Sequence, residues 1–165
     1  MYLAAHHFDV NPQDAVKARV NMEVAGVAVG AAALGIQLVS TARKVRTFIT
    51  SMEDAPEGLT NLESSLHQLE AILEQVTEII NTRSRHVDTS GPVDLLEQAV
   101  YKSEPNVMKL GHLVDKLQRR LGHGSRRRVL WASLSSIVNQ DDLVRYRSLL
   151  HEDLTALNTA LALMT

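Results

Sequence analysis

The chain of 165 residues contains no cysteine, and aromatic residues make up only 4% of it. Without cysteine there is no disulfide, no thiolate metal site and no thiol nucleophile, and an intracellular protein is the simpler expectation. The chain also lacks runs of Val, Ile and Thr that alternate with polar residues. Because such alternation is typical of a half-buried strand, we expect no β-sheet.

Motifs of the common enzyme classes are absent as well. The sequence has no glycine-rich phosphate loop, no His-Glu-x-x-His and no Gly-x-Ser-x-Gly. Glu63, Glu70, Glu74 and Glu78 lack the Glu-x-x-His partners of a di-metal centre, and the histidines are scattered. The arginines are not interleaved with aromatic residues, and no recognition-helix pattern is present. We therefore expect no enzyme, no cofactor, no metal and no nucleic-acid partner.

Apolar residues spaced three and four apart recur along most of the chain, and this is the period of a helix that packs on one side. Five helices are expected, over residues 22–52, 59–80, 92–121 and 129–134, and from a cap at Asn139 to Met164. The third should be kinked or restarted at Pro105. The expected fold is all-α, an antiparallel bundle of about five helices around a central apolar N-terminal helix.

The most apolar stretch runs from Val24 to Val39, sixteen residues with a single polar side chain, Gln37. As a helix it spans about 24 Å, against about 30 Å for the hydrocarbon core of a bilayer. Its seven Val, Leu and Ile residues favour insertion by about 2–4 kcal/mol, and its glycines and Gln37 oppose it. A constitutive transmembrane helix is therefore not expected. The stretch is either a core helix or a membrane-insertion helix released on activation, made of Val24, Gly26, Val27, Gly30, Leu34, Gly35, Ile36 and Leu38.

The three glycines of this stretch need an explanation of their own. Each glycine inside a helix costs about 1 kcal/mol relative to alanine. Close approach of a neighbouring helix is the usual compensation, and we expect it at Gly26 and Gly30.

Charge is segregated along the chain. Residues 47–82 hold seven acids and no Lys or Arg, whereas residues 102–147 hold ten basic and four acidic residues. One interpretation is that these regions pack together as complementary faces of the bundle. The other is that the basic region faces an outside partner. In the second case an anionic-surface site is expected at Arg119, Arg120, Arg126, Arg127 and Arg128, which flank one glycine-rich turn.

Several short motifs occur in a characteristic order. They are Met22–Ala28, Leu34–Val39, Asp54-Ala55-Pro56 before a Leu-rich helix, Val129–Ala132, and Leu157–Leu161 at the end of a helix with an acidic cap. Over the span from Met22 to Met164 the chain resembles the HeLo-like N-terminal domain of fungal STAND proteins. The SesA-type and pigment-cluster N-terminal domains have a similar layout.

The resemblance implies an N-terminal cell-death effector domain of a fungal NOD-like receptor or related protein, as in heterokaryon incompatibility and fungal innate immunity. Such a domain oligomerises, moves from the cytoplasm to the plasma membrane and permeabilises it through its first long helix. The implied partners are membrane lipid, other copies of the chain, and receptor regions in cis or in trans. The domain would comprise residues 22–165, after an extension of residues 1–21 that is weakly structured or a short helix. The alternative, from another class, is a soluble helical adaptor without membrane activity.

Overall fold

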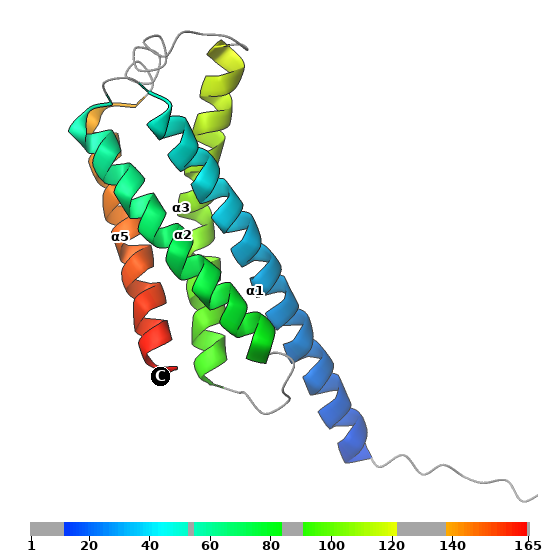
Figure 1. Cartoon of the computed structure of the whole chain (residues 1–165). Coiled ribbons are helices and arrows are strands. Elements are labelled where there is room, and N and C mark those ends of the chain that lie inside the picture. Colours follow the sequence, from blue (N-terminus) through cyan, green and yellow to red (C-terminus); the bar gives the residue numbers. More distant parts are fainter. Residues whose placement is uncertain (1–11, 53–54, 84–90, 122–137, 165) are drawn as a thin grey trace, which may run out of the picture.

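The computed structural model describes residues 12–52, 55–83, 91–121 and 138–164, and for residues 12–28, 83, 92, 120 and 121 it describes the backbone only. The described residues form four helices and no strands: α1 (Pro12–Thr50), α2 (Glu57–Arg83), α3 (Pro92–Leu121) and α5 (Gln140–Ala162) (Figure 1). The all-α class is thereby confirmed for this part of the chain. The short helix expected at residues 129–134 lies outside the described residues, so the count of five is not confirmed.

The helices form where the apolar spacing predicts them. On α2 the whole predicted seam is buried, at Leu59, Leu62, Leu66, Leu69, Leu73, Val76 and Ile80. The last helix starts at the expected cap, where the Asn139 side chain accepts a hydrogen bond from the backbone N–H of Asp142 at 2.8 Å. The Asp142 side chain accepts one from the backbone N–H of Asn139 at 3.2 Å. This reciprocal capping box fixes the start of α5.

Two helices are more continuous than predicted. α1 begins at Pro12, so residues 12–21 continue into the rest of the helix instead of forming a separate short one. α3 runs through Pro105 without a restart. A proline inside a helix costs about 3 kcal/mol. Burial of Val100, Val107 and Leu110 on either side of Pro105 offsets that cost, because tertiary packing outweighs local propensity.

The helices stand at four corners. α1 packs against α2 and α3, and α5 packs against the same two helices. Within the described residues the backbones of α1 and α5 do not come into close contact. Figure 1 shows in addition that the N-terminal turns of α1 extend past the ends of the other helices. The predicted central place of α1 is therefore not confirmed, since in this part of the chain only two helices cover it.

The second half of α1 carries most of its buried surface. Leu38, Ala42, Val45 and Ile49 follow one another at spacings of three and four and are at most 4% exposed. They belong to one core cluster with the seams of α2, α3 and α5. The bundle is thus anchored on the C-terminal half of α1, and the N-terminal half lies toward its edge.

Candidate functional site

An apolar strip lies on the side of α1 that faces neither α2 nor α3. Val29, Ala33 and Ile36 are spaced four and three apart, so they share one face of the helix. All three are exposed, Val29 to 67% and Ile36 to 60%. Farther along the same face, Ser40 and Thr47 make the surface polar. We call Val29, Ala33 and Ile36 the outer strip. Two large apolar side chains exposed two turns apart, with Ala33 between them, form a small patch of a kind that interaction sites use.

On its inner sides α1 approaches its neighbours closely at two glycines. A Cβ atom added at Gly35 would collide with Oγ1 of Thr77 on α2. A Cβ added at Gly111 on α3 would lie 2.6 Å from Cγ2 of Thr41 on α1. Neither would fit without a shift of the neighbouring side chain. These two glycines therefore set how near α2 and α3 come to α1.

Gly30 has more room than Gly35. The nearest atom to a Cβ added there is the Tyr101 hydroxyl, at 3.0 Å, and this side chain is 41% exposed. Close approach was expected at Gly26 and Gly30, but the structure shows its tightest instance on α1 at Gly35. Gly26 lies in the part of α1 where only the backbone is described.

An ionic network joins α1 to α2. Arg43 donates from Nε to Glu70 Oε1 at 2.7 Å and from Nη2 to Glu74 Oε1 at 2.8 Å. Arg46 Nε lies 3.2 Å from Glu70 Oε2, an ion pair without hydrogen-bond geometry. The hydrogen bond and the charge of Glu70 raise the pKa of Arg43. Glu70 is only 7% exposed, so the two arginines compensate a nearly buried carboxylate.

We call Arg43, Arg46, Glu70 and Glu74 the Glu70 network. The network bears on the first interpretation of the charge segregation, in which the acidic residues 47–82 pack against the basic residues 102–147. That packing would have paired the acids of α2 with residues 102–147. Among the described residues, the ion pairs of these acids go to α1 instead.

Polar contacts also hold α1 to α3. Lys44 forms an ion pair with Asp115, and this hydrogen bond lowers the pKa of the Asp115 carboxyl. Two turns earlier, Gln37 Nε2 lies 3.9 Å from the sulfur of Met108. The second half of α1 is thus held from two sides, whereas no described residue covers the outer strip.

The residues predicted for membrane insertion do not share one side of α1. Leu38 is fully buried, Gly35 is buried, Gly30 and Leu34 are partly buried, and Ile36 is exposed. Val24, Gly26 and Val27 belong to α1, where the structure describes their backbone only. An isolated protomer therefore presents Ile36, and not the whole set, to an outside partner.

The predicted anionic-surface site is described only at its edge. Arg119 is exposed on α3, and Arg120 lies in the part of α3 with the backbone alone. Arg126, Arg127 and Arg128 fall outside the described residues. The cluster stays a prediction.

Two general kinds of site are absent from the described part of the chain. No helix there combines the length and the apolarity needed to cross a membrane. No group of three or more His, Asp or Glu side chains there is arranged to hold a metal ion.

A buried carboxyl group between α3 and α5 was not predicted. Asp153 is 1% exposed, and its two oxygens accept hydrogen bonds from Asn106 Nδ2 at 2.9 and 3.2 Å. Burial raises the pKa of Asp153, against the effects of Asn106 and of the positive charge of Lys102. A sequence signal existed, because Asp153 lies three residues after Leu150 and four before Leu157, in register with the apolar seam of α5.

No protein-family model, curated protein or solved structure matches this chain significantly. The function is therefore inferred from the residues themselves, and chiefly from the outer strip of α1.

Proposed function

We propose that this chain is a HeLo-like helical effector domain that associates with further copies and acts at a membrane through α1. The observation that carries the proposal is the outer strip, which no described helix covers. The order of motifs between Met22 and Met164 supports the same role. In this role the domain is cytoplasmic at rest and moves to the plasma membrane on activation. Its partners are lipid, other copies of the chain, and STAND receptor regions in cis or in trans.

Magnitudes favour many copies or a surface over a simple dimer. Full burial of a Val or Ile side chain contributes about 1.5–3 kcal/mol, so Val29 and Ile36, about two thirds exposed, have about 2–4 kcal/mol left to gain. Bringing two proteins together costs about 4–15 kcal/mol. The strip is too small to offset that cost in one pair. Copies held side by side on a membrane are at high local concentration, and each contact between neighbours contributes this burial energy again.

The resting bundle in this proposal is the five-helix form that the sequence predicts, with the short helix at residues 129–134 as the further helix and α1 central to it. On activation the N-terminal half of α1, up to about Gly35, changes its partners. In the resting bundle the apolar core residues and the Glu70 network of the C-terminal half hold α1 and oppose this change. A segment that is apolar but marginal as a membrane span suits such a conditional role.

A soluble adaptor is the second candidate. The absence of a membrane-spanning helix in the described residues favours it, and the same outer strip would then dock on a helix of a protein partner. The two functions differ in one property, which is the effect on lipid bilayers.

Leakage of dye from anionic liposomes tests the proposal. The decisive variant is Ile36→Glu, which changes an exposed residue and leaves the buried core untouched. A charge within an inserting helix costs about 2.5–3.5 kcal/mol, which overturns a marginal balance. The matched control is Leu163→Glu at the C-cap of α5, because Leu163 is 61% exposed and gives the same change of charge and hydrophobicity elsewhere on the bundle.

We expect the parent chain and Leu163→Glu to release dye in proportion to protein concentration, and Ile36→Glu to release little. Circular dichroism should show the same helix content in all three. If the parent releases no dye at any concentration, membrane action is wrong and the adaptor is the better account. If both variants behave as the parent does, α1 is not the active element.

A further inference from the structure

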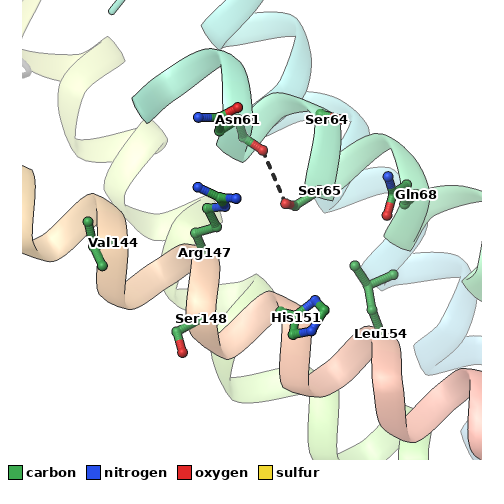
Figure 2. Close-up of a pocket in the computed structure, with 9 residues that line it drawn as sticks. All are labelled: Asn61, Ser64, Ser65, Gln68, Val144, Arg147, Ser148, His151 and Leu154. Carbon is green, nitrogen blue, oxygen red and sulfur yellow. Dashed lines mark hydrogen bonds between the residues drawn. The ribbon is translucent and has the colours of Figure 1, made fainter. Parts of the chain in front are cut away.

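A groove of about 500 Å³ lies between α2 and α5, on the opposite side of the bundle from the contact of α1 with α3. Its α2 wall carries Asn61, Ser64, Ser65 and Gln68, and its α5 wall carries Arg147, Ser148 and His151. Figure 2 shows the Arg147 side chain extending from α5 toward Asn61 and Ser65 of α2. Polar side chains from two helices thus converge on one hollow.

The groove is free of acids although both helices are rich in them. α2 has five glutamates and α5 has four acidic residues, yet none of these nine lines the groove. Within the described residues Arg147 takes part in no ion pair, whereas Arg43 and Arg46 both pair with Glu70. A positive charge therefore faces an open space that is surrounded by neutral hydrogen-bonding groups.

We propose that this groove binds the phosphate group of an organic phosphate, with Arg147 as its main cation. A guanidinium group matches the oxygens of a phosphate with two parallel hydrogen bonds. Asn61 lies across from it and offers its side-chain amide as a further donor to the remaining oxygens, whereas the Ser65 hydroxyl donates to the Asn61 carbonyl of its own helix at 3.1 Å. A metal cation would find no carboxylate there. Val144 and Leu154 flank the polar part and give apolar contact to the organic part of the ligand, for which the groove has room.

The phosphate has two conceivable sources, a soluble phosphate ester or the headgroup of a lipid. The proposal is independent of the membrane function assigned to α1. All residues that line the groove belong to α2 and α5, and among the described residues the backbone of α1 makes no close contact with that of α5.

Two probes separate the sources, both used with the full chain. Phenyl phosphate is titrated in solution and followed by calorimetry at low and moderate salt. Vesicles of phosphatidylcholine with and without phosphatidic acid are tested by co-sedimentation. The variant is Arg147→Gln, and its matched control is Arg145→Gln, which removes the same charge from an exposed position of α5 outside the groove.

We expect saturable binding of at least one probe, weakened about tenfold or more by Arg147→Gln, because hydrogen bonds to charged groups carry that much affinity. Arg145→Gln should change the affinity less than about twofold, a salt-screened effect of a distant exposed charge. Loss of phenyl phosphate binding identifies a soluble ligand, and loss of vesicle binding alone identifies a lipid headgroup. Binding of neither probe, or equal effects of the two variants, overturns the proposal.

Discussion

Three of the buried polar side chains are satisfied in different ways. Thr77 donates from its hydroxyl to the Leu73 carbonyl of its own helix at 2.6 Å. Asp153 is held by Asn106 across two helices, and Glu70 by arginines. A buried polar group costs stability unless it has partners, so these residues mark positions where single substitutions have large and opposite effects.

Gly35→Ala should destabilise the bundle by about 1–3 kcal/mol, because the new methyl group collides with Thr77 in a packed interface. For a chain of this size that is a fall in Tm of about 2–4 °C per kcal/mol. The matched control is Gly30→Ala, which has only the movable Tyr101 hydroxyl nearby and gains up to about 1 kcal/mol of helix propensity. A second change, Thr77→Ala, should recover part of the loss in Gly35→Ala. Equal melting temperatures for the two glycine variants would show that Gly35 does not set the distance between α1 and α2.

Asp153→Asn should stabilise the bundle by about 1 kcal/mol at pH 7, since it keeps a partner for Asn106 and removes a buried charge. The sign follows from linkage. The pKa of Asp153 is raised in the folded state, so the folded chain binds more protons than the unfolded chain, and stability falls as the pH rises above about 4.

Chemical denaturation of parent and Asp153→Asn between pH 3.5 and 7 checks this expectation. The difference between their free energies of unfolding should widen as the pH rises. It should narrow toward pH 3.5, where the carboxyl is mostly protonated in both states. Glu152→Gln, an exposed neighbour on α5, should stay within about 0.5 kcal/mol of the parent. A variant Asp153→Asn that is less stable than the parent at pH 7 would mean that the ionised carboxylate contributes to the fold.

Among the helices, the buried side of α2 could be predicted from the sequence, and that of α1 only in part. The seam from Leu59 to Ile80 has one apolar side, and all of it is buried. α1 is apolar all round in its first half, so its pattern does not tell which side its neighbours cover. The structure leaves Val29 and Ile36 exposed and buries Leu38. A kink or a restart was predicted at Pro105, and α3 continues through it without a restart because packing on both sides of the proline outweighs local propensity.

Glu70→Gln should weaken the attachment of α1 to α2, because it takes the charge from the centre of the Glu70 network. We expect a loss of about 1–3 kcal/mol, since Arg46 then keeps its charge in a partly buried place without its partner. Glu74→Gln is the control: Glu74 is 53% exposed, and pairs of that kind are worth about 0.2–1 kcal/mol.

The same pair of variants connects stability to function. If α1 must change its partners to act, Glu70→Gln should reach half-maximal dye release at a lower protein concentration than the parent, and Glu74→Gln should not. Urea denaturation and liposome leakage measure the two effects on the same samples. A destabilised Glu70→Gln with unchanged leakage would separate the Glu70 network from any release of α1.

At the scale of the whole molecule, the bundle has two distinct outer regions. The edge formed by α1 is apolar and uncovered along the outer strip, and the face between α2 and α5 is a polar groove. The spacing of the apolar residues and the lack of strand-like alternation predicted the all-α class. The groove could not be predicted, because Arg147 and Ser65 are ordinary surface residues until the parallel packing of two distant helices brings them together.

An environment-sensitive label on α1 tests the membrane role of the outer strip most directly. The chain has no cysteine, so Ile36→Cys and Leu163→Cys each offer one attachment site for a fluorophore whose emission reports on water. Both positions are exposed, and both labels should show emission typical of water in the free protein. With anionic liposomes that leak dye, the label at position 36 should shift to the blue and brighten, and the label at position 163 should not. Leakage with the label at position 36 still in water would contradict a membrane role for this face of α1.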